Sequence, residues 1–88
     1  MARSEFLDVE SMLGEIVPNA DMFFILGMTY SNGQSVPADL VSAHKWFNLA
    51  AMHGQTDAAR LRREIATEMS DTEIAVAQRA ARDWFRRH

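Results

Sequence analysis

Apolar residues recur at three- and four-residue intervals along almost the whole chain, which is the spacing of one face of an α-helix. The spacing is helical rather than the alternation of apolar and polar residues that marks a half-buried β-strand. This periodicity predicts an all-α protein. The 88 residues are enough for a single domain of this class and exclude a large multidomain enzyme.

Five helices are expected from the periodicity and from the residues that begin and end each run. Their expected ranges are about 4–16, 20–31, 39–53, 56–69 and 71–85 or slightly beyond. Asn19 and Asp39 are expected to cap the second and third helices, and Gly33 and Gly54 to end them. The run Ser70-Asp71-Thr72-Glu73 has the spacing of a capping box, which places the start of the last helix.

The packing of these helices is indicated by small residues and apolar stripes. Short loops between helices leave an up-down bundle or an array of helical hairpins. Gly27 in the second helix and Ala50-Ala51 in the third predict a close approach of the two, which favours a hairpin. The last helix is expected to direct one stripe inward, formed by Ile74, Ala77, Ala81, Trp84 and Phe85.

Composition limits the classes of partner and compartment. The formal net charge of -3 gives no overall basic field that would attract nucleic acid or anionic lipid. The chain has no cysteine, which excludes disulfides, thiol catalysis and thiolate metal ligands. The longest apolar run, residues 22–26, is far shorter than the roughly 20 residues of a membrane-spanning helix. The N-terminal residues lack the pattern of a secretory signal, so we expect a cytoplasmic protein with no membrane partner.

Residues 19–54 carry several motifs in a fixed order. They are Leu26-Gly27-Met28-Thr29-Tyr30, Gly33, Val36-Pro37, Asp39, Ala43, Trp46-Phe47, Ala50-Ala51 and Gly54. In this order and spacing they resemble one Sel-1-like repeat, a relative of the tetratricopeptide repeat. Ser35, Ser42 and Met22 depart from the family pattern. The C-terminal run from Met69 to Trp84 also resembles the helical cap that follows the last repeat in many proteobacterial members.

The resemblance implies a short α-solenoid of antiparallel helical hairpins in one domain. Residues 1–18 would form an N-terminal capping helix, 19–54 one full repeat, and 55–88 a half repeat with a C-terminal capping helix. The positions implied to be structural are Leu26, Gly27, Tyr30, Gly33, Pro37, Asp39, Ala43, Phe47, Ala50 and Gly54. Members of the family act mainly as adaptors and scaffolds, so the resemblance implies a bacterial protein-binding module with no catalytic residue and no cofactor.

A binding groove is implied in the same way. In the tetratricopeptide hairpin the first helix of each pair lines the concave face, which here would contain Asp21, Phe24, Met28, Asn32, Arg60 and Glu64. Exposed apolar side chains in a groove are typical of a binding surface. The alternative is that Phe24 and Met28 are core residues, covered by the first helix or by a loop. The expected occupant is a partner protein or peptide, or a second copy of the chain.

Self-association is expected because a hairpin repeat cannot bury its apolar face alone. This sequence has one full repeat, which predicts a homodimer. Trp84 and Phe85 have two interpretations: a plug that caps the hairpins, or an anchor for a second subunit. Residues 1–18 likewise either pack as a cap or serve as a docking segment.

The histidines and the C-terminal arginines raise the question of two other kinds of site. His44 and His53 are about half a turn apart around one helix axis, so they cannot share a metal ion, and no carboxylate forms a recognisable catalytic pair. Arg79, Arg82 and Arg86 share one helix face, which is the pattern of a small nucleic-acid-binding regulator and is kept as the alternative function. Cations near the end of a helix also suit the helix dipole without any ligand.

Overall fold

The computed structural model describes residues 19–88, and within this range the chain is all-helical. The helices are α2 (Ala20–Asn32), α3 (Leu40–Met52), α4 (Ala58–Ala66) and α5 (Asp71–Arg87). The prediction of an all-α protein is confirmed for this part of the chain. The helix expected at about 4–16, and the capping role of residues 1–18, lie outside the described residues.

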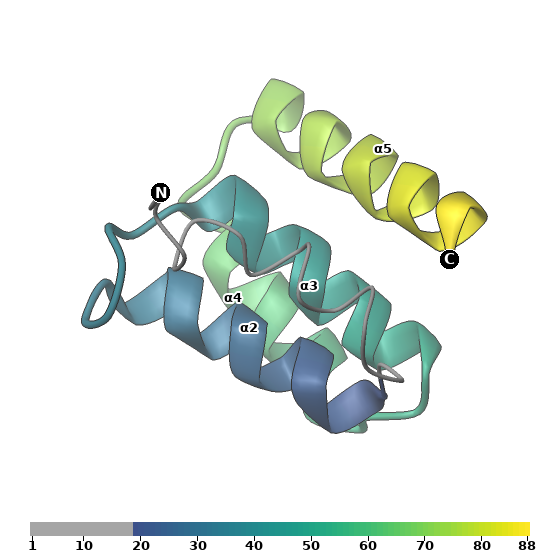
Figure 1. The fold of residues 1–88 in the computed structure, drawn as a ribbon. Helices are drawn as coiled ribbons and strands as arrows, with labels where there is room; N and C mark the ends of the chain where they lie inside the picture. Colours follow the sequence, from purple (N-terminus) through teal and green to yellow (C-terminus); the bar gives the residue numbers. More distant parts are fainter. Residues whose placement is uncertain (1–18) are drawn as a thin grey trace, which may run out of the picture.

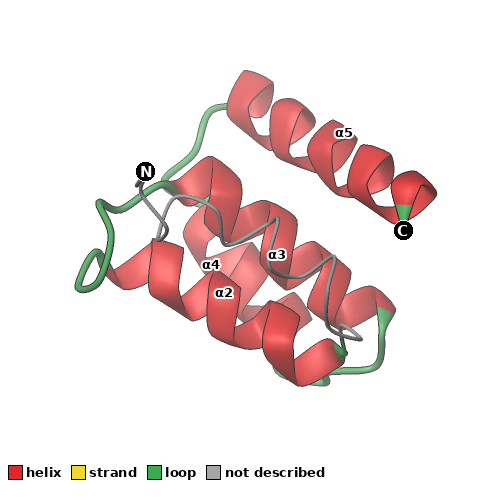
Figure 2. Cartoon of the chain, in the orientation of Figure 1, coloured by secondary structure: helices red, strands yellow, loops and turns green. Residues whose placement is uncertain are grey.

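Helix α3 occupies the centre of the arrangement. It runs antiparallel to α2 at its side, α5 lies along another of its sides, and α4 lies behind the α2–α3 pair (Figure 1). Short loops join successive helices (Figure 2). Because α3 contacts α2, α4 and α5, its buried residues come from several faces: they are Ala43, His44, Trp46, Phe47, Leu49 and Ala50.

The helices begin at the residues that the sequence indicates. The Asn19 side chain accepts a hydrogen bond from the backbone N–H of Met22, at 2.9 Å. The Asp39 carboxylate accepts one from the N–H of Ser42, at 3.1 Å. Each bond satisfies one of the N–H groups that have no partner inside the first turn of a helix. The predicted caps of α2 and α3 are therefore confirmed.

The capping box at the start of α5 is also present. The hydroxyl of Ser70 accepts from the N–H of Glu73 at 3.0 Å, and the Glu73 carboxylate accepts from the N–H of Ser70 at 2.9 Å. Both bonds are local, so the four-residue pattern was sufficient to locate them.

The close approach of α2 and α3 is made through Gly27, but not to the expected partner. A Cβ at Gly27 would lie 2.4 Å from Cδ1 of Phe47, so the aromatic ring fills the space above the glycine. The ring of Phe47, and not Ala50 or Ala51, supplies the three atoms nearest to that position. Both Phe47 and Ala50 are buried, and they lie about one turn apart on the same face of α3.

The turn between α2 and α3 uses one glycine in the left-handed region. Gly33 has φ 71°, a conformation that a residue with a Cβ rarely adopts, and it ends α2 as predicted. The backbone N–H of Asp39 donates to the carbonyl of Tyr30 at 2.9 Å, which ties the start of α3 to the end of α2. The other positions of the repeat motif take several environments: Leu26 and Tyr30 are half-buried, Pro37 is exposed in the loop, and Ala43 is buried.

The loop between α3 and α4 is held by hydrogen bonds at the end of α3 and at the start of α4. The N–H of Gln55 donates to the carbonyl of Ala50 at 3.0 Å, and that of Gly54 to Ala51 at 3.1 Å, which is the Schellman pattern with Gly54 at φ 97°. The Gln55 side chain then accepts from the N–H groups of Asp57 and Ala58, at 2.7 and 3.1 Å. This side chain caps α4, which is shorter than the expected range of 56–69 and ends at Ala66.

The core joins α2, α3 and α5 through aromatic rings. Phe23 stacks on Trp46 with centroids 5.9 Å apart, and Trp84 packs edge-on against Phe23 at 5.1 Å and Trp46 at 5.7 Å. Such edge-to-face and offset contacts are favourable for aromatic pairs. Trp84 thereby attaches α5 to both helices of the α2–α3 pair.

Candidate protein-binding surface

The outer face of α2 is the face directed away from α3. Ile25 and Met28 are 62% and 40% exposed there, although both are large apolar residues. They are three positions apart on a helix, so their side chains are neighbours on its surface. Asp21 and Asn32 lie at the two ends of the same face and are exposed. We call these four residues the α2 outer face.

Phe24 flanks this face rather than lying at its centre. Its ring is half-buried and packs at a tilt on Phe47, with centroids 5.8 Å apart. Phe24 therefore packs partly against the core. Met28 is more exposed than Phe24, so Met28 and Ile25 form the apolar centre of the face.

The two expected groove residues on α4 interact with their own helix. The guanidinium of Arg60 lies 3.2 Å from the Glu64 carboxylate and 3.7 Å from that of Asp57. All three side chains are more than half exposed, and exposed ion pairs of this kind contribute little stability. These ion pairs within α4 account for the side-chain conformations of Arg60 and Glu64, and no contact with α2 is needed to explain them.

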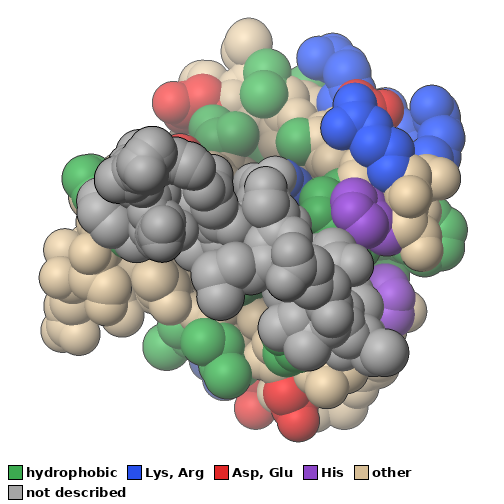
Figure 3. All heavy atoms as spheres, viewed as in Figure 1, with side chains coloured by type: hydrophobic (Ala, Val, Ile, Leu, Met, Phe, Trp, Pro, Cys, Tyr) green, Lys and Arg blue, Asp and Glu red, His purple; other side chains and the backbone are tan. Residues whose placement is uncertain are grey.

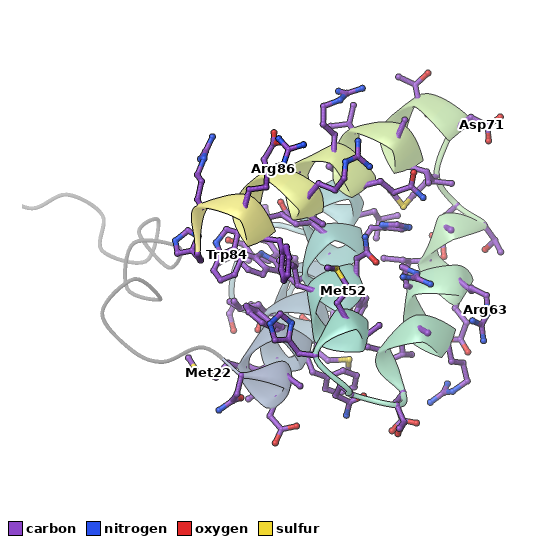
Figure 4. The ribbon with its side chains drawn as sticks, turned by 90° about the vertical axis from the view of Figure 1, so that its right-hand side faces the viewer. Met22, Met52, Arg63, Asp71, Trp84 and Arg86 are labelled. Carbon is purple, nitrogen blue, oxygen red and sulfur yellow. The ribbon has the colours of Figure 1, made fainter. Side chains whose placement is uncertain are left out.

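The two aromatic residues near the C-terminus separate into different roles. Trp84 is only 7% exposed and belongs to the core, whereas its neighbour Phe85 is 51% exposed. Phe85 therefore does not belong to the buried stripe of α5, and that part of the prediction is wrong. Figure 4 shows Trp84 on the side of α5 that faces the other helices.

A polar contact lies between α3 and α4. Arg62 donates from Nη1 to Oδ1 of Asn48 at 2.6 Å. One turn before Asn48, His44 is 97% buried, since only 3% of its surface is exposed, and its Nδ1 has no hydrogen-bond partner within the described part of the chain. Burial lowers the pKa of His44 below its ordinary 6.5, and the nearby positive charge of Arg62 lowers it further. His44 is thus held in the neutral form.

The remaining histidines pack against the aromatic core. His53 donates through Nδ1–H to the carbonyl of Leu49 at 2.8 Å, and its ring lies tilted against Phe23. His88 makes the same kind of bond to the carbonyl of Trp84 at 3.0 Å and stacks on the Trp84 ring at 4.0 Å. These contacts give both residues a structural role at the ends of α3 and α5.

The sequence did not indicate Ile25 as an exposed residue, and it gave His44 only as a histidine that cannot share a metal ion with His53. Ile25 lies within the apolar run of residues 22–26, where every side of the helix is apolar and the pattern gives no outward direction. The sequence gives only a weak indication that His44 is buried. It follows Ala43, a residue of the expected repeat motif, and lies one turn before Asn48.

Within residues 19–88, no helix combines the length and the apolar character needed to cross a bilayer. The same residues contain no group of three or more His, Cys, Asp or Glu side chains arranged to hold a metal ion. The described residues expose an apolar surface on α2 and a basic one on α5, which is treated below.

Comparison of the chain with protein-family models, with curated proteins and with solved structures finds no match in any of the three.

Proposed function

We propose that this chain is a short Sel-1-like helical repeat protein that binds another protein, or a second copy of itself, and does not act as an enzyme. Support comes from the places where the repeat motif meets a physical requirement. Gly27 makes room for a ring of α3, Gly33 and Gly54 adopt positive φ, and Asp39 caps α3. In this proposal α2 and α3 are one solenoid hairpin, and α4 and α5 complete and cap it.

The observation that carries the proposal is the apolar centre of the α2 outer face. Ile25 and Met28 form an adjacent pair of large apolar side chains that helix packing leaves exposed. Single exposed apolar residues are common, whereas adjacent ones bounded by polar residues are typical of interaction sites. Methionine also adapts its shape to different partners. Asp21 and Asn32 supply the polar boundary.

A cytoplasmic setting is part of the proposal and follows from composition. The chain contains no cysteine, so its stability does not depend on an oxidising compartment.

The test is site-specific photocrosslinking at the α2 outer face. A photoreactive phenylalanine analogue replaces Met28 in one variant and Met52 in a matched control, because Met52 is an exposed methionine at the end of α3, outside the α2 outer face. We expect a crosslinked product from position 28 and none of that composition from position 52. Identification of the product by mass spectrometry separates a foreign protein from a crosslinked pair of identical chains.

A further variant at position 28 tests the oligomeric state. Met28→Asp introduces a charge at the centre of the α2 outer face, where it opposes any apolar contact, while the helical circular dichroism should remain. If the chain is a dimer through this face, light scattering over a dilution series will show the dimer for the wild type and a monomer for Met28→Asp. Equal crosslinking at positions 28 and 52, or none at either, would refute the assignment of this face.

A further inference from the structure

The C-terminal half of α5 carries a basic stripe on the side opposite the core. Arg79, Arg82 and Arg86 fall within about 60° of arc around the helix axis and extend over about 10 Å of its length. The buried residues Ala77, Ala81 and Trp84 lie on the other side. Figure 3 shows blue side chains gathered over this end of the molecule, and Figure 4 shows Arg86 directed away from the helices beneath α5.

The charges of this stripe are largely unneutralised. Arg86 has a long, exposed ion pair with Asp83, at 3.9 Å. Among residues 19–88, no acidic side chain forms an ion pair with Arg79 or Arg82. The helix dipole favours cations only within the last turn, so it accounts for Arg86 but not for Arg79, which lies two turns earlier.

Apolar side chains border the stripe on both sides. Val76 is 42% exposed on one flank, and the exposed Phe85 lies on the other. At the C-terminal end, Asp83, Arg86 and Arg87 line a shallow hollow. The outer side of α5 therefore offers a row of guanidinium groups between two apolar borders.

This combination fits one kind of partner better than nucleic acid. Phosphate contacts need positive charge alone and gain nothing from an apolar border such as Val76. An amphipathic helix with carboxylates at three- and four-residue spacing would face the arginines with its acidic row and the borders with its apolar residues. We propose that the outer side of α5 binds an acidic amphipathic helix of a partner protein.

The site is distinct from the α2 outer face, and its test uses the full chain. The probe is a fluorescein-labelled peptide of about 15 residues, with glutamates at three- and four-residue spacing and leucines beside them, long enough to form a helix. A shuffled peptide of the same composition and a single-stranded DNA of similar length are measured in parallel. Binding is followed by fluorescence anisotropy.

Two matched double variants locate the binding. Arg79→Gln with Arg82→Gln removes two charges from the stripe, and Arg60→Gln with Arg63→Gln removes two exposed charges from α4. We expect the first pair to weaken peptide binding about tenfold and the second to leave it nearly unchanged. Val76→Ser with Phe85→Ser should also weaken it, whereas Met28→Asp should not, which keeps this test independent of the α2 outer face.

Three results would overturn the proposal. The first is no binding of the ordered peptide, or equal binding of the shuffled one. The second is an equal loss of affinity in the α5 and α4 double variants, which would mean that overall charge is responsible. The third is tighter binding of the DNA that depends on Arg79 and Arg82 but not on Val76 and Phe85, which would assign the stripe to nucleic acid.

Discussion

The contact between Gly27 and Phe47 gives a sharp prediction about the stability of the α2–α3 pair. In Gly27→Ala the new methyl group would lie 2.4 and 2.5 Å from two atoms of the Phe47 ring. Carbon atoms in favourable contact are about 3.5–4.0 Å apart, so the helices must separate by about 1 Å or the ring must rotate. Phe47 is 1% exposed and is held by its neighbours, including Phe24, so neither adjustment is easy.

The expected magnitude follows from two opposing effects. Overpacking a buried site costs about 1–3 kcal/mol, and the rigidity of the ring places this site near the upper end. Alanine is favoured over glycine inside a helix by about 1 kcal/mol, which acts in the opposite direction. The net change is therefore a loss of about 2 kcal/mol in the free energy of unfolding. For a domain of this size, that loss lowers Tm by roughly 8–16 °C.

The assay is thermal and urea unfolding followed by circular dichroism, with a double-mutant cycle as the control. Phe47→Leu removes the ring atoms that the methyl group would meet, so Gly27→Ala should cost much less in that background than in the wild type. If Gly27→Ala alone is as stable as the wild type, or if its cost is the same in both backgrounds, the account of the α2–α3 contact is wrong.

Three further predictions concern other described contacts. The free energy of unfolding should fall as the pH drops below 6.5 toward about pH 5. The pKa of His44 is lowered in the folded chain, so the unfolded chain binds the proton first and is favoured at low pH. His44→Gln should reduce this fall, as measured by urea titrations between about pH 8 and pH 5. Ser70→Ala should cost about 1 kcal/mol through loss of the capping box, whereas Thr72→Ala, in the same first turn, should cost less in the same assay. Trp84→Ala should cost about 3–5 kcal/mol, and Phe85→Ala, which removes a half-exposed ring in contact with His53, about 1 kcal/mol or less, as measured by calorimetry.

The sequence was sufficient wherever the deciding interactions are local. Asn19, Asp39 and Ser70 bond to backbone groups three residues away, so a short pattern contains both partners. The positive φ of Gly33 and Gly54 was predictable for a similar reason, because it depends on the conformation of a single residue. The helix starts and the two glycine turns were predicted for these reasons.

Contacts between helices were less predictable, because they depend on how each helix is rotated about its axis. Trp84 and Phe85 are adjacent, about 100° apart around α5, and sequence alone assigned both to the buried side. Ile25 was hidden by apolar neighbours on every side of α2. The ring of Phe47, rather than a small alanine, reaches Gly27, which a pattern of small residues does not reveal.

The aromatic core has a spectroscopic consequence. The chain contains two tryptophans, and their rings lie 5.7 Å apart, one on α3 and one on α5. All of the indole emission therefore originates at the junction of these two helices. A red shift of the emission maximum would report the release of α5 from α3 without any added label, and near-ultraviolet dichroism would register the loss of coupling between the two rings. Comparing either signal with far-ultraviolet dichroism during unfolding would show whether α5 leaves before the other helices melt.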